Sequence, residues 1–203
     1  MSGYDLFVPS ISREEIEAKA FDWRYAFGVG STWAVDIPRI LEHDLPKIIP
    51  EFALRVLLAE AMAGDEARTH HTVPAIDIRV DVYERLCAWD GRGRLTGAHE
   101  LGHLVLHSGD SRPRAVVEIK ANTIPRHRSS ERQAYDFAAS FLTPESIVRQ
   151  FDSPAELAAG CKITPRAAEV RMRGLGLWPK GRPLPEGVEE AIRKMKEQVK
   201  RER

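Results

Sequence analysis

Features that mark secreted, membrane-bound and disulfide-linked proteins are scarce in this chain of 203 residues. Cysteine occurs only as Cys87 and Cys161, so the sequence implies no disulfide framework and suits a reducing compartment. No segment approaches the run of about 18 apolar residues that a membrane span needs. The first residues carry no basic region followed by an apolar run, as a signal peptide would. We therefore expect a cytoplasmic protein without membrane contact.

Net charge is also absent. The 30 Lys and Arg residues balance the 30 Asp and Glu residues, so the overall charge does not indicate a polyanion-binding protein. Hydrophobic residues make up 43% of the chain, which is enough for a core. The length favours one domain, or one domain with a small appendage.

One short motif carries the strongest chemical signal. Residues 99–103, His-Glu-Leu-Gly-His, form an H-E-x-x-H pattern, of which about 0.02 copies are expected by chance in such a composition. On a helix, His99 and His103 lie on one face, one turn apart, where two imidazoles can bind one zinc ion. Glu100 points to the side, within reach of a water that the metal activates. The motif predicts two metal ligands and a general base for hydrolysis. The structural alternative is a helix with two histidines on its polar edge.

The residues around the motif favour a helix over 96–107. Thr96 is a candidate cap for its start, and apolar residues follow at helical spacing. Gly102 lies inside this helix, where it costs about 1 kcal/mol relative to alanine. We interpret this glycine as a sign that another backbone or the substrate comes close to the helix.

His107 extends the face that carries the two motif histidines. On a straight helix it lies about 6 Å along the axis from His103 and about 12 Å from His99, so the three cannot share one ion. We expect His107 to support a ligand or to end the helix rather than to bind the metal. Three other histidines lie in polar stretches and are interpreted as solvated loop residues: His70, His71 and His127.

Glu131 is the better candidate for a third ligand. Ser130 and Gln133 form an S-x-x-Q capping box, which predicts that a helix starts at Glu131. A carboxylate near the buried stripe of that helix is costly unless it is paired or bound to metal. A first-turn glutamate can also serve the helix dipole, and the sequence alone leaves the two interpretations about even. Asp110 and Glu118, in the segment between the two helices, are fallback ligands.

A known family shares both motifs. The chain has A-H-E-L-G-H-L-x-L-H at 98–107 and E-x-x-A-x-x-F-A-A-x-x-L-x-P at 131–144, and the pair resembles the ImmA/IrrE metallopeptidases. These are soluble, zinc-dependent, gluzincin-like endopeptidases of bacteria and mobile elements. Characterised relatives cleave a lambda-repressor-like helix-turn-helix regulator and so release its target genes. Tyr135 stands where Asn or Asp is common in the family, and Thr143 stands where Met is common, which bears on the wall of the cleft rather than on the metal chemistry.

The resemblance implies a role for each matching residue. His99, His103 and Glu131 would be zinc ligands, and Glu100 would be the general base. The implied partner is a protein substrate, a lambda-repressor-like helix-turn-helix regulator, whose cleavage would derepress its target genes.

The expected fold class is α+β: a mostly helical, zincin-like metallopeptidase domain with a small β-sheet that precedes the H-E-x-x-H helix. We expect a helical extension over 1–30 and the zinc metallopeptidase domain over 31–178. A linker and a charged helix are expected over 179–203.

Local patterns predict the helices before the motif. A capping box of Ser12 and Glu15 starts the first helix, and Asp36 caps a second helix over 37–43. A third helix is predicted over 51–63, with its apolar residues on one face.

After this segment the spacing of the apolar residues changes from helical to alternating. Residues 76–82 alternate between apolar and polar side chains, which predicts a half-buried strand, and 83–88 would continue or pair with it. Residues 90–93 carry a turn signal. A strand directly before the metal helix has a functional use, since its edge could hold an extended peptide by backbone pairing.

Two short helices that resemble a helix-turn-helix are expected within 153–176, capped by Ser153 and Thr164. Residues 162–182 hold six basic residues and one acidic residue, Glu169, which could contact phosphates. The stronger interpretation is that these helices close the peptidase domain, and direct binding of nucleic acid is the weaker alternative.

Two other functions stay open on the sequence. One is a non-enzymatic regulator that binds DNA or another partner and keeps a structural zinc, which would need four protein ligands. The other is a metalloprotease toxin with a different protein target. The sequence does not name the scissile bond, the inducing signal or the oligomeric state.

Overall fold

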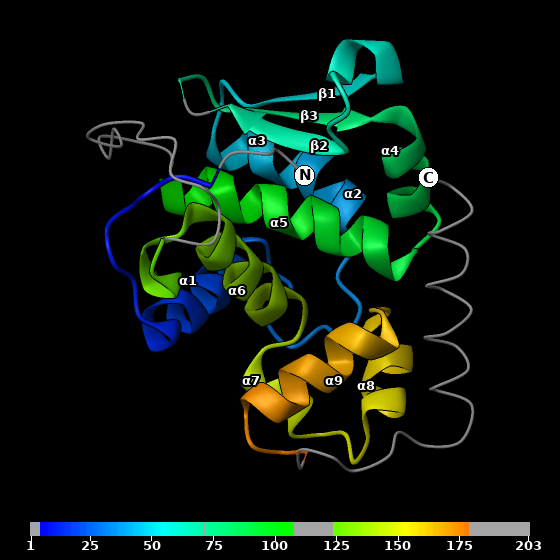
Figure 1. The fold of residues 1–203 in the computed structure, drawn as a ribbon. Coiled ribbons are helices and arrows are strands. Elements are labelled where there is room, and N and C mark those ends of the chain that lie inside the picture. Colours follow the sequence, from blue (N-terminus) through cyan, green and yellow to red (C-terminus); the bar gives the residue numbers. More distant parts are fainter. Residues whose placement is uncertain (1–4, 71, 108–123, 179–203) are drawn as a thin grey trace.

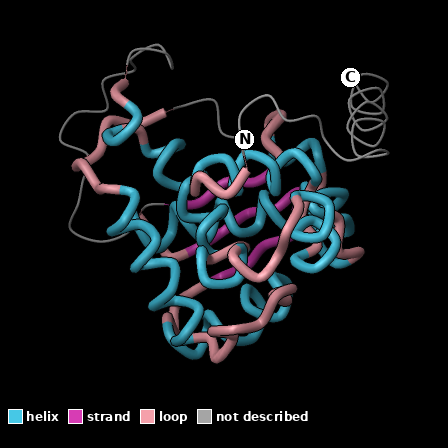
Figure 2. The backbone as a smooth tube through the Cα atoms, turned by 90° about the horizontal axis from the view of Figure 1, so that it is seen from below, coloured by secondary structure: helices cyan, strands magenta, loops and turns pink. Residues whose placement is uncertain are grey.

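A computed structural model describes residues 5–70, 72–107 and 124–178. The expected class is confirmed, because most of the described residues are helical and a single small sheet accompanies them. The helices lie against one face of the sheet, as the view from below in Figure 2 also shows. None of the described helices is long and apolar enough to cross a membrane.

The layers of the fold centre on α5 (Gly91–His107). The sheet lies on one side of this helix, and α6 (Ser130–Leu142) packs along its other side (Figure 1). Helix α1 (Arg13–Ala26) packs in turn against α6. The large apolar side chains between these layers are almost fully buried, among them Leu101, Phe137 and Phe141.

The sheet has three strands: β1 (Ala53–Leu57), β2 (Ala67–His70) and β3 (Ala75–Arg79). Their order is β1-β3-β2, with β1 parallel and β2 antiparallel to the central β3. Ile76 and Ile78 point from β3 into the core. The predicted use of the β3 edge is therefore wrong, because β3 is paired on both sides. Among the described strands, the free edges belong to β1 and β2.

The predicted helix over 51–63 is wrong. This segment forms β1, followed by a short 3-10 helix over Ala59–Met62. The backbone of β1 pairs with β3, far along the chain, and Val56 stays largely exposed rather than on a helical core face. Tertiary pairing overrides the local helical pattern here.

The predicted strand over 76–82 is too long. Strand β3 ends at Arg79, and α4 (Val80–Cys87) follows at once. Val82 and Leu86 are both buried, and their spacing of four residues is that of one helical face. The alternation over 76–82 therefore fits a helix after residue 79 as well as a strand.

Several predicted helix starts are confirmed by side-chain caps. Ser12 and Glu15 form the capping box of α1. Asp36 caps α2 (Ile37–Arg39), which continues through a π-helical turn (Ile40–Asp44) into α3 (Leu45–Ile48), beyond the predicted end at 43.

Helix α5 begins earlier than predicted. The carboxylate of Asp90 accepts from the backbone N–H groups of Arg92 and Gly93, so the predicted turn is the start of the helix. Thr96 does not cap it, because its hydroxyl donates to the carbonyl of Arg92 inside the first turns.

The C-terminal helices follow the prediction. Ser153 caps α8 (Pro154–Cys161), and Thr164 caps α9 (Pro165–Gly174). A single turn, α7 (Glu145–Val148), connects them to α6. Other predictions lie outside the described residues: His71, the fallback ligands Asp110 and Glu118, and the linker and helix of 179–203.

Candidate metal centre

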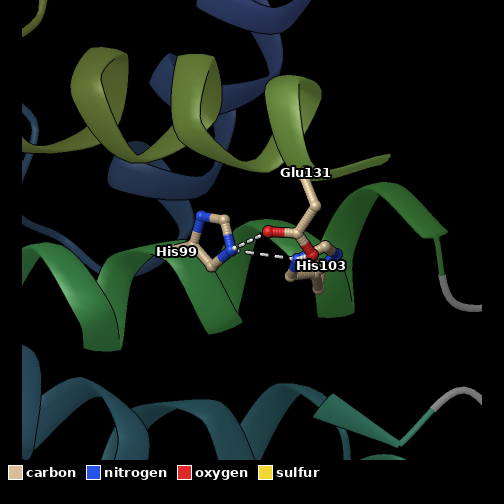
Figure 3. Close-up of side chains that lie close together, drawn as sticks. All are labelled: His99, His103 and Glu131. Atoms are coloured by element: carbon tan, nitrogen blue, oxygen red, sulfur yellow. Dashed lines mark hydrogen bonds and ion pairs between the residues drawn. The ribbon is translucent and has the colours of Figure 1, made fainter. Parts of the chain in front are cut away.

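Three side chains converge between α5 and α6 (Figure 3). His99 and His103 come from one face of α5, and Glu131 comes from the first turn of α6. The Nε2 atoms of the two histidines are 3.0 Å apart. The Glu131 carboxylate lies 3.3 Å from His99 Nε2 and 3.2 Å from His103 Nε2. Both histidines are at most 6% exposed, so the cluster is held inside the protein.

The spacing of these atoms fits a tetrahedral zinc ion. Zinc binds histidine nitrogen and carboxylate oxygen at about 2.0–2.2 Å, so two ligand atoms on a tetrahedral ion lie about 3.3 Å apart. The three separations between His99, His103 and Glu131 are close to that value, and one potential ligand atom from each residue lies within 4.8 Å of the others. Two imidazoles and one carboxylate are also a ligand set that zinc accepts at catalytic sites.

The charges within the cluster are suited to a cation. Burial disfavours ionisation of Glu131, but its contacts with His103 and His99 outweigh this and lower the pKa of Glu131 to about 2. Burial likewise opposes protonation of His103, yet the Glu131 contact and the nearby Glu100 charge raise the pKa of His103. The carboxylate is thus held ionised beside two imidazoles, which supplies negative charge for a bound cation.

A close approach of the two helices makes this convergence possible. A Cβ atom on Gly102 would lie 3.0 Å from the carbonyl oxygen of Ala134 and 3.2 Å from its Cα. Of the two predicted reasons for Gly102, the close approach of another backbone is confirmed. Ala134 is three residues after Glu131, on the same side of α6.

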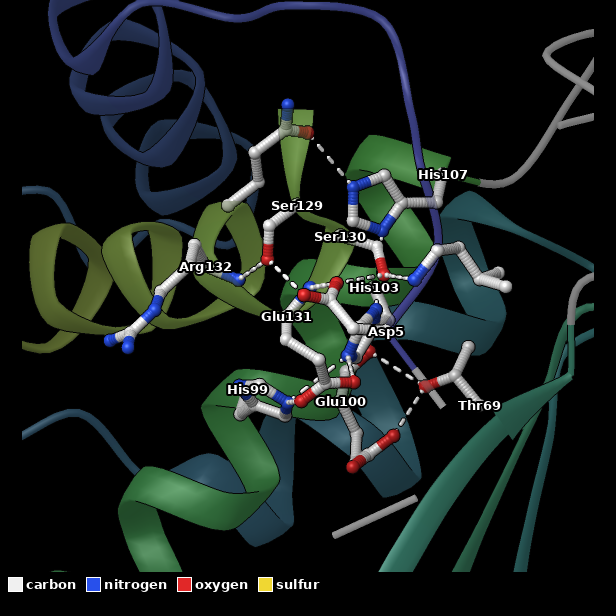
Figure 4. Close-up of polar contacts among 12 residues, drawn as sticks. Asp5, Thr69, His99, Glu100, His103, His107, Ser129, Ser130, Glu131 and Arg132 are labelled. Carbon is white, nitrogen blue, oxygen red and sulfur yellow. Dashed lines mark hydrogen bonds and ion pairs between the residues drawn. The ribbon is translucent and has the colours of Figure 1, made fainter. Parts of the chain in front are cut away.

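The start of α6 is held by the N-terminal segment, as Figure 4 shows. The Asp5 carboxylate accepts from the backbone N–H of Glu131 at 3.2 Å and from the Ser129 hydroxyl at 2.7 Å. Ser129, rather than Ser130, accepts from the helix backbone as the cap, so the predicted capping box of Ser130 and Gln133 is wrong. Sequence analysis missed Asp5, because the partner residues are more than 120 positions away.

His107 contacts His103 on the side of the ring that faces away from Glu131. Its Nδ1 lies 3.2 Å from Nδ1 of His103, and its Nε2 lies 3.0 Å from Oε1 of Gln133. With His103 using Nε2 toward the cluster, its Nδ1–H can donate to His107, which in turn donates to Gln133. Such a chain fixes the ring orientation and the tautomer of His103.

Glu100 lies on the same helix but faces elsewhere. It is only 3% exposed, and its carboxylate points toward β2 rather than into the cluster (Figure 4). Thr69 on β2 donates a hydrogen bond of 2.7 Å to Oε2 of Glu100. Glu100 is thus placed next to the cluster without belonging to it, and sequence analysis gave no sign of Thr69.

An open groove of about 1210 Å³ lies between α1, α6 and α9, and none of His99, His103, Glu131 or Glu100 lines it. Tyr135 lines it and lies against His99, with 4.3 Å between the ring centroids. Burial and the Glu131 charge raise the pKa of Tyr135 to about 12, so its hydroxyl stays protonated. Leu95, one turn before His99, also lines the groove, whose other walls come from α1 and α9. Tyr135 therefore lies between this groove and the His99 ring.

His127 and His70 lie away from the cluster. His127 is exposed in a 3-10 turn, as predicted. His70 is not a loop residue: it lies in β2, and its ring is 2.9 Å from the buried carboxylate of Asp77. Arg55 and Arg68 contact the same carboxylate, so this group is an ion-pair network on the far face of the sheet.

The basic residues of α9 are largely engaged within the protein. Arg166 and Arg173 pair with the buried carboxylate of Glu169. Arg171 pairs with Glu17 of α1 and is itself buried. Arg166 and Arg171 also line the groove. The arginines of α9 are therefore paired within the helix or with α1.

A small sheet lies over a helix that carries H-E-x-x-H, and the following long helix of the described chain brings a carboxylate to the two histidines. This combination defines the class of zincin-like metallopeptidase domains. The chain belongs to the peptidase M78 family, whose IrrE N-terminal-like domain model matches residues 52–172. No curated protein matches the chain.

Proposed function

We propose that this protein is a zinc-dependent endopeptidase that cleaves a helix-turn-helix transcriptional repressor and thereby derepresses the repressor's target genes. The observation that carries the proposal is the buried cluster of His99, His103 and Glu131, whose donor atoms have the spacing of zinc ligands. Membership of a peptidase family supports the reaction class.

The chemistry divides between the metal and the chain. His99, His103 and Glu131 would hold zinc, which when bound supplies a Lewis acid that polarises a carbonyl and lowers the pKa of water. Glu100 takes the proton from the attacking water and later gives it to the leaving amine. His107 and Gln133 keep the His103 ring oriented through their hydrogen-bond chain.

A polypeptide substrate is supported by the strand beside Glu100. Strand β2 has a free edge there, among the described strands, to which an extended peptide could pair. The repressor as substrate rests on the family resemblance, and the fold by itself does not specify it.

Metal content provides the first test. Elemental analysis of the purified protein should give one zinc per chain, with a sharp reduction in His99→Ala, His103→Ala and Glu131→Ala. His127→Ala is the matched control, because His127 is exposed and lies outside the cluster, so this variant should keep its zinc. Full zinc in Glu131→Ala would remove Glu131 from the ligand set.

Cleavage provides the second test. Glu100→Gln should keep zinc, fold and substrate binding, while cleavage of a co-expressed helix-turn-helix regulator falls by at least ~10²-fold. The variant should hold the intact regulator in a complex that can be purified. Undiminished cleavage by zinc-loaded Glu100→Gln would contradict the role of Glu100 as the general base. Cleavage of a different protein instead of any regulator would favour the toxin alternative.

The regulator with a structural zinc receives less support. A structural site is closed by four protein ligands, whereas three side chains gather in the described part of the chain. The arginines of α9 that would meet DNA are engaged with Glu169 and Glu17.

A further inference from the structure

Thr69 makes the polar contact that fixes Glu100. Its Oγ1 lies 2.7 Å from Oε2 of Glu100 and 2.9 Å from the Glu100 carbonyl oxygen. Among the described residues, no other hydrogen-bond partner of the Glu100 side chain is found. A carboxylate that is buried this deeply needs a donor, because an unpaired charge inside a protein is costly. The hydroxyl of Thr69 therefore determines where the Glu100 carboxylate lies.

The strand register explains why Thr69 can do this. In an antiparallel pair, residues alternate between those whose backbone groups bond to the partner strand and those whose backbone groups point away. The backbone N–H of Arg79 donates to Glu66, which makes Glu66 a bonded position. Counting along β2, the pair of Thr69 and Ile76 is then a non-bonded one. The backbone of Thr69 thus faces the outer edge of the sheet.

The side chain of Thr69 points in a second direction. It shares a face of the sheet with Ala67 and with Ile76 of β3, both of which are fully buried toward α5. Arg68 and His70 point to the opposite face, where they meet Asp77. Thr69 therefore presents its backbone N–H and C=O at the outer edge of β2, while its side-chain hydroxyl contacts the Glu100 carboxylate on α5.

We propose that Thr69 is a positioning residue for Glu100, which holds the general base in register with a substrate lying along the β2 edge. The inference rests on the proposed function for the role of Glu100. The sheet holds the Thr69 side chain against α5, so the hydroxyl that donates to the carboxylate fixes the direction of the Glu100 carboxyl group.

The test compares two substitutions at position 69. Thr69→Val keeps the branched shape and removes the hydroxyl, whereas Thr69→Ser keeps the hydroxyl. We expect Thr69→Val to lower kcat by about 10-fold or more, with KM and zinc content within about two-fold of wild type. Thr69→Ser should restore most of kcat. Thr96→Val is the matched control, because it removes a threonine hydroxyl that contacts only the backbone of α5, and its kcat should stay near wild type.

A double variant separates positioning from a structural effect. When Glu100→Gln has already removed the base, adding Thr69→Val should lower the residual rate by less than two-fold. An equal fall of kcat in both backgrounds would overturn the proposal, and so would a rise of KM with kcat unchanged.

Stability of the zinc-free protein gives a readout that does not depend on activity. Thr69→Val leaves the buried Glu100 carboxylate without its donor, so the melting temperature should fall by about 3 °C or more, and Thr69→Ser should fall by less. If no substrate is cleaved by wild type, the proposed function fails while this comparison still tests the contact. Equal melting temperatures for Thr69→Val and wild type would show that the hydroxyl does not hold Glu100.

Discussion

Gly102 offers the sharpest test of how the cluster is built. In Gly102→Ala the new Cβ would lie 3.0 Å from the carbonyl oxygen of Ala134 and 3.1 Å from Cδ1 of Phe137. Ordinary contacts begin at 3.4 Å, so α6 must move away by about 0.4 Å. Zinc–ligand distances tolerate about ±0.2 Å. Because Glu131 lies one turn from Ala134, the displacement should move its carboxylate out of range.

The expected effect on the free energy of unfolding is small, whereas the expected effect on zinc affinity is large. Alanine in place of a helical glycine gains about 1 kcal/mol, and overpacking costs about 1–3 kcal/mol, so the free energy of unfolding of the zinc-free protein should change little or fall modestly. Zinc affinity should fall at least about 10-fold, which corresponds to about 1.4 kcal/mol. Competition with a chromophoric chelator measures the affinity, and urea unfolding measures the stability.

Gly97→Ala is the matched control on the same helix. Its Cβ would meet side-chain atoms of Ile37, at 2.9 Å, and of Leu86, at 3.3 Å, rather than the backbone of α6. The strain falls on α2 and α4 and leaves the spacing of α5 and α6 unchanged, so zinc affinity should stay within about two-fold of wild type. If folded Gly102→Ala binds zinc as tightly as Gly97→Ala does, then the helix spacing does not set the cluster geometry and the argument is refuted.

Three further outcomes follow from the structure. Asp77→Asn should lower the free energy of unfolding at pH 7 by about 2 kcal/mol, because burial opposes ionisation but His70 and two arginines outweigh it and lower the pKa of Asp77. Since that contribution is present above the unfolded pKa and is lost as the pH falls through the lowered folded pKa, the gap between wild type and variant in urea unfolding should close as the solution is acidified, and a constant gap would contradict it. Asp5→Ala should cost about 1 kcal/mol in the same assay and weaken zinc binding several-fold, whereas Asp152→Ala, at an exposed position, should do neither. Gel shifts at physiological salt should show little DNA binding, and sub-micromolar sequence-specific binding would favour the regulator alternative.

The parts of the fold that could be predicted are those set by neighbours in the chain. Ser12, Asp36, Ser153 and Thr164 each cap a helix whose backbone lies within three residues of the cap. The H-E-x-x-H spacing is local as well, because one helical turn brings its two histidines together.

The parts that could not be predicted depend on distant partners. Strand β1 exists because β3 pairs with it, and its own sequence fits a helix equally well. Thr69 meets Glu100 across 31 residues, and Asp5 meets Glu131 across 126. The S-x-x-Q pattern favours Ser130 as the cap of α6, but the docked N-terminal segment engages Ser130 through Leu6 and Asp5, and Ser129 caps the helix instead.

The contact of Asp5 with Glu131 also has a consequence for biosynthesis. The family match covers 52–172 and contains the whole cluster, yet it leaves out Asp5 and all of α1, whose buried Arg24 donates to the carbonyl of Phe141 in α6. A fragment cut to the matched residues would lose both attachments of α6. Because the chain is made from its N-terminus, Asp5 reaches its place only after α6 has been made. Until then the nascent chain lacks Glu131 and cannot form the cluster.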